Sequence, residues 1–427
     1  MPRSTAEVRE GTVQPLSDCT DAPSFTNAPA TCCTKRCCDG AKSDLSSTPF
    51  RMVEKKYKLY ELSRREARRQ PALPETDMTD VVKLHDLNQN TEENRRMIHK
   101  VVVPAPSRGR EGAAASAGAE SVSSTAGPFP DQMNAGVNAA AAHEAVTCYT
   151  FAGVPGLLLF PGVLSAAEQQ RWCRASILNF GDSATHPNIL STHAKTPHAT
   201  TCYQPPMRWA TLGYSYEWTN KVYHRDRFSP FPASLRQRMC ELVSLVAQVK
   251  QDGFRCAYPE VYEPQTAIVN YYPVGSMMMC HQDISEETLE QPLLSLSLGC
   301  SAIFLMGTQS REDAPHSFLL RSGDVAAFTG PSRTAFHSTP RILDDCPAYL
   351  TVPDAQMTEA EKQCYHQHAY YAHPTADGSF VPVDKAAMTA EEQERYWRLC
   401  MRHMRVNINA RQVYNERCAA VFAEGPR

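Results

Sequence analysis

The amino-acid sequence predicts an α+β protein whose main part is a double-stranded β-helix, or jelly-roll barrel, with supporting N-terminal helices. Eight short segments with strand character follow one another between residues 266 and 415. Turn signals such as Ser322-Gly323-Asp324 separate several of them, and helical patterns precede them. Many short strands at close spacing, with helices in front, are typical of a double-sheet jelly roll.

Composition restricts the classes of function. The 427 residues carry a formal net charge of -3, so no global field favours nucleic acid and any basic surface must be local. The 16 cysteines are too dilute for a disulfide scaffold, no secretory pattern begins the sequence, and no run approaches about 18 apolar residues. We therefore expect an intracellular protein with reduced thiols and no membrane partner. The cytoplasm or nucleus is favoured, and the mitochondrion stays open.

The composition changes sharply along the chain. Pro, Thr, Ser and Ala dominate the start, and Ala, Ser, Gly and Pro dominate a later stretch that has no apolar period. Such segments bury too little apolar surface to fold, which indicates a tail and a linker. The predicted parts are a disordered Cys-rich tail (1–48), a basic helical extension (49–103), a disordered linker (104–145), the main domain (146–415) with an insert (344–403), and a second tail (416–427).

Two groups of Cys and His residues raise the question of additional metal sites. Neither has a standard zinc spacing, so a reactive-thiol tail and an inserted surface loop are favoured over Zn²⁺ binding, which stays the alternative. The groups are Cys32, Cys33, Cys37 and Cys38 in the tail, and Cys364, His366, His368 and His373 in the insert.

A basic amphipathic helix is expected over residues 49–70. Phe50, Val53, Tyr57 and Tyr60 share one face at helical spacing, and Lys and Arg dominate the other. The favoured interpretation is a surface helix that packs its aromatic stripe on the main domain. Contact of the basic face with phosphates is the alternative.

Three further helices are expected. Ser165 with Glu168, and Ser234 with Gln237, have the spacing at which side chains satisfy free amides at a helix start. The apolar residues after Ser234 form one stripe, which predicts that this helix packs on a sheet. The expected ranges are 166–180, 234–250 and 389–404.

The stretch 207–218, MRWATLGYSYEW, has strand periodicity. Leu212, Tyr214, Tyr216 and Trp218 are expected to share an aromatic-rich face, opposite smaller and polar residues. Core packing is the favoured interpretation of this face. The alternative is that at least one of its aromatic rings stacks on a nucleobase.

A metal site is indicated by His281, Asp283 and His337. Side chains two residues apart on a strand point the same way, about 6.6 Å apart, so His281 and Asp283 are expected to share a face of a strand over 277–283. His337, on a strand expected over 333–339, adds the second imidazole of a two-His-one-carboxylate triad. Such a triad leaves three octahedral positions open, enough for a bidentate 2-oxo acid and O₂, whereas zinc favours a tetrahedral site.

The last expected strand, 404–415, has one polar face. A solvated surface would explain this face, but a strand that follows two ligand strands is well placed to line the barrel cavity. A guanidinium buried there needs an anion and offers a two-point fork to a carboxylate. Asn270 and Tyr272, again two residues apart, can supply further donors. The polar face consists of Arg405, Asn407, Asn409 and Arg411.

These motifs resemble those of the AlkB family of Fe(II)/2-oxoglutarate dioxygenases, and most of all its homologue-one branch. The resemblance covers about residues 150–415, with a weaker echo at 49–86. The family pieces are Asn270-Tyr271-Tyr272, His281-Gln282-Asp283, PLLSLSLGCSAIF at 292–304, Ser322-Gly323-Asp324, His337, and Arg-x-Asn-x-x-x-Arg at 405–411. The branch pieces are RWATLGYSYEW at 208–218, Phe231-Pro232, LGCSAIFLMG at 298–307, Glu312-Asp313-Ala314-Pro315 and RVNINARQV at 405–413.

The resemblance implies a role for each site residue. Three residues would bind Fe(II), five would bind 2-oxoglutarate and four would bind the substrate base. Among the five, Arg405 would hold the distal carboxylate of 2-oxoglutarate, and Arg411 would lie near its metal-bound end. Tyr214 would sandwich that base with His281, and Ser285 replaces an acid of the bacterial members, which leaves base choice open. The Fe(II) set is His281, Asp283 and His337. The 2-oxoglutarate set is Asn270, Tyr272, Arg405, Asn407 and Arg411, and the base-binding set is Tyr214, Tyr216, Trp209 and Ser285.

The activity that the resemblance implies is oxidative demethylation of methylated nucleobases in nucleic acid. Fe(II) would be the cofactor, 2-oxoglutarate and O₂ the cosubstrates, and tRNA the favoured partner. The alternatives are a DNA dealkylation repair enzyme with the same chemistry, a protein hydroxylase, and a non-catalytic binding barrel. A monomer is expected.

Overall fold

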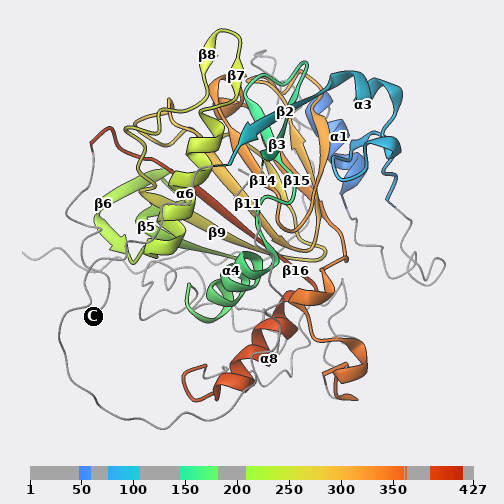
Figure 1. Ribbon diagram of the computed structural model, residues 1–427, viewed down its shortest axis with the longest axis vertical. Helices are drawn as coiled ribbons and strands as arrows, with labels where there is room; N and C mark the ends of the chain where they lie inside the picture. The colour runs from blue at the N-terminus through green and yellow to red at the C-terminus, as the bar shows by residue number, and fades with distance from the viewer. Residues whose placement is uncertain are drawn as a thin grey trace, which may run out of the picture. The chain divides into compact units, whose positions relative to one another are not determined.

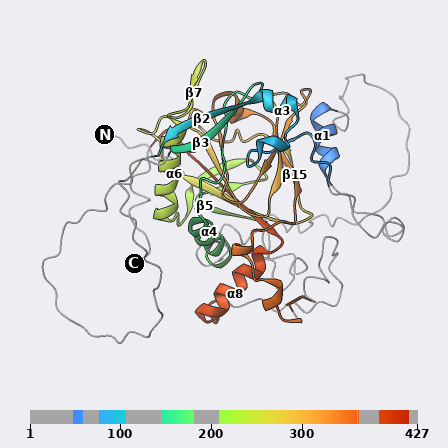
Figure 2. The ribbon, with the colours of Figure 1, turned by 45° about the vertical axis from the view of Figure 1, so that its right-hand side comes forward.

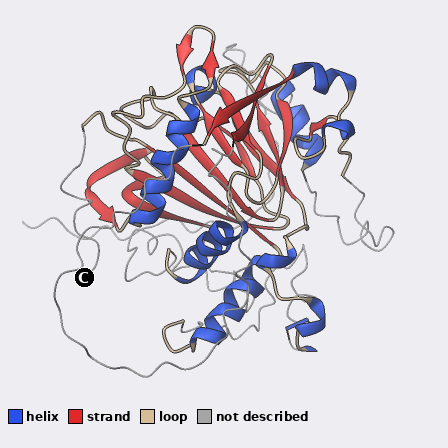
Figure 3. Ribbon diagram, in the orientation of Figure 1, coloured by secondary structure: helices blue, strands red, loops and turns tan. Residues whose placement is uncertain are grey.

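The computed structural model describes residues 48–58, 76–105, 145–180, 208–359, 361–362 and 385–416. Strands in these ranges form a nine-stranded sheet, a five-stranded sheet and a two-stranded ribbon, accompanied by helices (Figure 1, Figure 3). The described part is therefore mostly sheet with some helices, and its strands do not join into one closed hydrogen-bonded barrel. Both Cys/His groups, Tyr60 and nearly all of the expected tails and linker lie outside the described residues.

The nine-stranded sheet is antiparallel throughout, in the order β2-β3-β4-β14-β11-β16-β9-β5-β6. Its strands are β2 (Ile98–Pro104), β3 (Ala145–Phe151), β4 (Leu157–Phe160), β14 (Val325–Phe328), β11 (Leu293–Gly299), β16 (Met404–Arg411), β9 (Thr266–Pro273), β5 (Trp209–Glu217) and β6 (Val222–Ser229).

The five-stranded sheet has the order β1-β13-β12-β15-β10, so β10 is an edge strand. Its strands are β1 (Val81–Val82), β13 (His316–Leu320), β12 (Ala302–Met306), β15 (His337–Ile342) and β10 (Met278–His281), and the ribbon consists of β7 (Lys250–Gln251) and β8 (Phe254–Arg255). Leu157, Phe304, Phe318 and Phe328 belong to one buried cluster with members from both sheets, so the two sheets face each other across this core.

The other face of the nine-stranded sheet is covered by helices. Val406, Ile408 and Ala410 of β16 pack in a second core with α4 (Ala166–Leu178), α6 (Ala233–Val246) and α8 (Ala390–Met401). Because side chains alternate along a strand, Arg405, Asn407, Asn409 and Arg411 point to the opposite side, between the sheets. The period-two prediction for this strand is confirmed.

The helix starts agree with the sequence in one case and not in the other. Ser165 and Glu168 form the predicted capping box, since each side chain accepts from the other residue's backbone amide. The predicted cap of Ser234 with Gln237 is wrong. α6 begins at Ala233 after the extended Pro232, which places Ser234 inside the first turn, and the side chain of Gln237 donates to Glu241 instead. This helix ends at Val246, before the expected residue 250.

The N-terminal segment is built into the sheets. Phe50 and Tyr57 of α1 (Pro49–Tyr57) are buried in a cluster with Ile303 and Leu319, which confirms the packing predicted for the aromatic stripe. Figure 2 shows α1 near β15, and the two elements are in contact. Farther along, β1 joins the five-stranded sheet and β2 the nine-stranded sheet, with η1 (Leu87–Gln89) and α3 (Glu92–Met97) between them.

The strand expected over 333–339 begins later than predicted. A 3-10 helix, η3 (Gly330–Thr334), occupies its start, and β15 runs from His337 to Ile342. This 3-10 helix begins with Gly330 and Pro331, and proline suits the first turn of a helix, where its missing N–H leaves no hydrogen bond unmade. Two more 3-10 helices, η4 (Ala348–Leu350) and η5 (Asp354–Gln356), lie in the described part of the insert. Among the described helices, none is long and apolar enough to cross a membrane.

Candidate metal centre and cosubstrate pocket

His281 and His337 face each other across neighbouring strands. They are direct cross-strand partners on β10 and β15, and their ring centroids are 4.4 Å apart. Nδ1 of His281 lies 2.8 Å from the Met279 carbonyl oxygen, and Nδ1 of His337 lies 3.1 Å from that of Ala335. Each ring can therefore donate from Nδ1 and present Nε2, as metal-binding histidines do.

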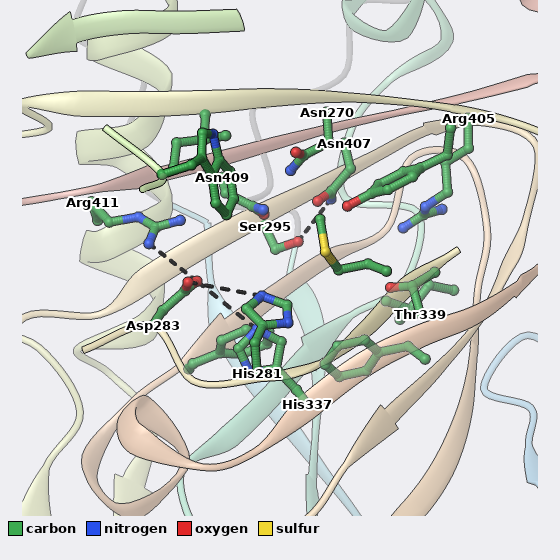
Figure 4. Close-up of a pocket in the computed structure, with 17 residues that line it drawn as sticks. Asn270, His281, Asp283, Ser295, His337, Thr339, Arg405, Asn407, Asn409 and Arg411 are labelled. Atoms are coloured by element: carbon green, nitrogen blue, oxygen red, sulfur yellow. Dashed lines mark hydrogen bonds and ion pairs between the residues drawn. The ribbon is translucent and has the colours of Figure 1, made fainter. Parts of the chain in front are cut away.

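The Asp283 carboxylate completes this group. Its two oxygens each lie 3.9 Å from one Nε2 atom, one on His281 and one on His337 (Figure 4). The three ligand atoms lie within 4.8 Å of one another. Two imidazoles and one carboxylate at this spacing are the donor set of a facial triad, which suits a non-haem iron with open positions.

Asp283 reaches its place from outside the strand. β10 ends at His281, so the expectation that one strand would align the two side chains is wrong, although the carboxylate does face both imidazoles. Buried Arg333 holds the loop instead: Nη1 donates to the Asp283 carbonyl at 2.6 Å and Nε to that of Gln291 at 3.3 Å. The Gln282 amide also donates to the Thr334 carbonyl, at 2.7 Å. Tertiary contacts, and not strand periodicity, aim this carboxylate.

A buried charge cluster surrounds Asp283. Nη1 of Arg411 lies 3.1 Å from Asp283 Oδ2 and 2.9 Å from Glu286 Oε1, and Nη2 of Arg333 lies 3.2 Å from Glu286 Oε2. Burial on its own would raise the pKa of Asp283, but Arg411 and the two histidines outweigh it and hold the pKa well below its usual range. The carboxylate is thus ionised at neutral pH.

The environment of His337 also favours the form of the side chain that binds a metal, which for histidine is the neutral one. Burial, followed by the nearby His281, lowers the pKa of His337 to about 4. Its imidazole is therefore neutral at physiological pH, and the neutral ring is the form that binds metals. The site combines a neutral imidazole with an ionised carboxylate, which fits a divalent cation.

A pocket extends from this triad along β16 and β9. Arg405 lies fully buried in it, where Nη2 donates to Ser297 Oγ at 2.8 Å and Nη1 to the Cys300 carbonyl at 3.3 Å. These hydrogen-bond partners are neutral, and burial lowers the pKa of the guanidinium to about 10. A buried cation with neutral partners favours an anionic ligand such as a carboxylate.

The other residues predicted for the cosubstrate meet at the same pocket (Figure 4). Asn270 and Tyr272 on β9 are the cross-strand partners of Asn407 and Arg405 on β16. The Asn407 amide donates to Ser295 Oγ at 2.8 Å and to the Leu296 carbonyl at 2.9 Å. The lining residues are Trp218, Ile268, Asn270, Tyr272, Met278, His281, Asp283, Ser295, Phe304, Leu320, Phe328, His337, Thr339, Arg405, Asn407, Asn409 and Arg411.

The aromatic strand is arranged differently from the prediction. Gly213 has φ +75 and lies so close to the Gln265 carbonyl that a Cβ would come within 2.1 Å of its oxygen, and the β5–β6 register shifts after Tyr214. This irregularity breaks the alternation. The shared face expected for Leu212, Tyr214, Tyr216 and Trp218 is wrong for Leu212, which packs on the helix side, whereas the rings of Tyr216 and Trp218 lie 5.0 Å apart and Trp218 lines the pocket.

Tyr214 is placed in a cluster of its own and not among the pocket-lining residues. It is 5% exposed, packs with Val413, and makes edge contacts with the rings of Phe228 and Tyr414 at 5.2 and 4.9 Å. This surrounding accounts for its burial without any contact to a base.

Trp209 and Tyr216 lie next to Trp218, and Ser285 lies next to Tyr216. The rings of Trp209 and Tyr216 lie 5.7 and 5.0 Å from that of Trp218, and the Tyr216 hydroxyl is 3.1 Å from Ser285 Oγ.

Sequence reasoning placed Trp218 on the aromatic strand but not in the site, and it missed Glu286 and Arg333. The available signal was charge close to both ligands, since Glu286 follows Asp283 by three residues and Arg333 precedes His337 by four.

A two-His-one-carboxylate triad beside a buried arginine, set between two sheets, defines the class of non-haem iron oxygenases that use a 2-oxo acid. The family model described as the 2OG-Fe(II) oxygenase superfamily matches residues 156–411. The chain belongs to this superfamily and, within it, to the AlkB family. Its cofactor is Fe(II), and its cosubstrates are 2-oxoglutarate and O₂.

Three curated relatives show how far the likeness extends. The DNA N(6)-methyladenine demethylase ALKBH1A of Arabidopsis thaliana is 26% identical over 413 residues, which cover 87% of this chain and 97% of that protein. The tRNA demethylase abh1 of Schizosaccharomyces pombe is 41% identical over 146 residues, 34% of this chain but only 45% of that protein. The N6-methyladenosine RNA demethylase ALKBH of Cryphonectria parasitica is 33% identical over 48% of this chain and 75% of its own length.

Proposed function

We propose that this protein removes methyl groups oxidatively from nucleobases in nucleic acid, with tRNA as the favoured substrate. One observation carries the proposal: the triad of His281, Asp283 and His337 opens into the same pocket as the buried guanidinium of Arg405. The three relatives described above are named as demethylases of DNA or RNA, which supports nucleic acid as the substrate class.

Each residue has a task in this proposal. His281, Asp283 and His337 hold Fe(II), and Arg405 binds the distal carboxylate of 2-oxoglutarate, assisted by Tyr272 and Asn270. When bound, the metal and cosubstrate supply the oxidant that hydroxylates a methyl group, while 2-oxoglutarate becomes succinate and CO₂.

The chain's further residues tune and shield this centre. Arg411 keeps Asp283 ionised and oriented. The apolar rings of Phe304 and Phe328 exclude water from the inner pocket. Asn407 and Asn409 line the wall next to the cosubstrate position.

The pocket mouth has the character of a base-binding surface. Trp218 is 38% exposed, Ile284, which directly follows Asp283, is 51% exposed, and Met279, two residues before His281, is 61% exposed. We assign stacking of the target base to Trp218 together with His281. Trp209 and Tyr216 then support the Trp218 ring, Ser285 is within hydrogen-bond distance of the Tyr216 hydroxyl, and Tyr214 serves the core.

The finer fold assignment and the setting of the protein belong to the same proposal. Two sheets that face each other across an apolar core support a double-stranded β-helix. We also propose an intracellular monomer, with the cytoplasm or nucleus favoured.

The test is mass spectrometry of nucleosides in methylated tRNA and methylated DNA after incubation with the protein, Fe(II) and 2-oxoglutarate. We expect loss of a methylated nucleoside from tRNA, with succinate formed in step, and no reaction with Asp283→Ala. An N-methyl group should leave as formaldehyde, whereas a C-methyl group should stay as a hydroxymethyl or formyl group.

Other results would redirect the assignment. Loss of methylated nucleosides from DNA alone would favour the DNA dealkylation enzyme, and the Arabidopsis relative is a demethylase of DNA. Turnover of 2-oxoglutarate with every nucleoside unchanged would refute the nucleic-acid proposal and favour a protein hydroxylase. Wild-type protein that neither binds metal nor forms succinate would indicate a non-catalytic barrel.

A further inference from the structure

Glu54 lies buried next to the strand that carries the first metal ligand. It belongs to α1, far upstream of the matched family region at 156–411, and is 1% exposed. One of its carboxylate oxygens pairs with Arg51 of the same helix. The other accepts the backbone N–H of Cys280 at 2.9 Å, and Cys280 directly precedes His281. A charge at this burial is costly unless both oxygens have partners.

The Cys280 amide needs such a partner because β10 is irregular there. In the pairing with β15, Met278 lies opposite Thr339 and His281 opposite His337, so three steps along β10 match two along β15. This is the count of a β-bulge, in which one residue loses its place in the ladder. β10 is also the edge of its sheet, so no further strand supplies an acceptor.

The bulge is linked to the metal ligand on its other side. Nδ1 of His281 lies 2.8 Å from the carbonyl of Met279, the second residue in the bulge. The orientation of that carbonyl thus decides which imidazole nitrogen carries the proton and where Nε2 points. Glu54 and the His281 ring thus both contact the backbone of Met279 and Cys280, Glu54 at the Cys280 amide and His281 at the Met279 carbonyl.

Helix α1 is itself firmly anchored. Phe50 is fully buried, its amide donates to the Arg311 carbonyl at 3.2 Å, and its ring lies 3.0 Å from where a Cβ on Gly307 would be. Thr48 caps the helix by accepting from the Arg51 amide. The carboxylate of Glu54 is therefore carried by a helix that is fixed to the rest of the domain.

We propose that Glu54 is a positioning residue of the metal centre, which sets the β10 bulge and so aims His281. This inference rests on the proposed role of His281 as an iron ligand. It makes the N-terminal helix a working part of the active site and not only a surface extension.

The test compares Glu54→Gln with Glu54→Asp in the full-length protein. Gln keeps an acceptor oxygen at the same reach but loses the charge, whereas Asp keeps the charge but falls short of Cys280 by one methylene. We measure the Kd for Mn(II), with 2-oxoglutarate present, by calorimetry, and the hydrogen exchange of the Cys280 amide in the metal-free protein.

We expect Glu54→Asp to weaken Mn(II) binding by about tenfold or more, the range known for groups that orient metal ligands, and to speed hydrogen exchange of the Cys280 amide. Glu54→Gln should bind Mn(II) within about threefold of wild type. If Glu54 merely provided an ion pair for Arg51, the order would be reversed. That reversed order, or wild-type affinity in both variants, would overturn the inference.

Glu361→Gln is the matched control. Glu361 is also buried and also paired with an arginine, Arg395, but it contacts the helix region of α8 and not β10. It should leave Mn(II) affinity and Cys280 exchange unchanged. Wild-type protein that fails to bind Mn(II) would refute the proposed function itself, which separates that failure from failure of the role of Glu54.

Discussion

Arg411 and Asp283 form a buried ion pair, with Nη1 of the arginine 3.1 Å from Oδ2 of the aspartate. The same nitrogen lies 2.9 Å from Glu286, so one guanidinium serves two carboxylates. The pair ties β16, a central strand of the nine-stranded sheet, to the loop that carries Asp283. Four predictions concern this pair, the cosubstrate arginine, His337 and the pocket mouth.

Replacing Arg411 should weaken metal binding in a pH-dependent way. In Arg411→Ala, Asp283 and Glu286 lose the guanidinium that lies between them and keep Arg333 as the remaining arginine nearby, so the pKa of one of them rises. We expect Mn(II) affinity to fall about 10- to 100-fold near pH 6 and to recover partly near pH 8. Calorimetric titration at both pH values measures this. A loss of affinity that is equal at both values would contradict the electrostatic explanation.

Replacing Arg405 should act on the cosubstrate and spare the metal. Arg405→Ala removes a charge-assisted contact, so the KM for 2-oxoglutarate should rise about 10- to 100-fold, with Arg405→Lys in between. Succinate formation at increasing 2-oxoglutarate gives the KM. Mn(II) affinity without 2-oxoglutarate is the internal control and should match wild type. An unchanged KM would remove Arg405 from the cosubstrate site.

The metal-free protein should lose stability as the pH falls from about 6.5 to about 4. The pKa of His337 is about 4 in the folded state against an ordinary value of 6.5, so over this window the unfolded chain binds more protons than the folded one. Stability therefore rises with pH and is fully present above the unfolded value. Asp283 and Glu286, whose pKa values are also lowered, add the same sign at still lower pH.

Urea unfolding with a chelator present, repeated at several pH values, tests this dependence. His337→Asn replaces this imidazole by an amide that does not titrate, so the slope of unfolding free energy against pH should be smaller in the variant than in wild type. An identical slope in the two proteins would show that other groups cause the loss.

Substitution of Trp218 should raise the KM for substrate, whereas substitution of Tyr214 should leave it unchanged. Stacking on a base is worth about 1–3 kcal/mol, so Trp218→Ala should raise the KM for a methylated oligonucleotide by roughly 5- to 100-fold and leave Mn(II) affinity intact. Tyr214→Leu removes the aromatic ring but keeps an apolar side chain in the buried cluster, so it should lower stability and still bind substrate like wild type. Initial rates over a substrate series measure both variants. The opposite ranking would return the base contact to Tyr214.

Local patterns in the sequence were sufficient for much of the fold. The polar and apolar faces of Arg405–Arg411 follow from strand alternation, and the capping box of Ser165 and Glu168 follows from spacing within one turn. Both depend on neighbours a few residues apart, which a single sequence displays directly. The three members of the triad could be named for a different reason, since two imidazoles and one carboxylate are a known donor set for iron and their motifs resemble those of the AlkB family.

What only the tertiary structure decided are relationships between distant residues. Asp283 is aimed by Arg333, fifty positions later, the irregularity at Gly213 places Trp218 at the pocket and Tyr214 in the core, and Glu54 meets the Cys280 amide 226 positions away. A bulge or a buried ion pair leaves no period in the sequence, because its partners are brought together by packing alone. The sequence by itself therefore determined the chemistry of the site, and the packed sheets decided which side chains aim it.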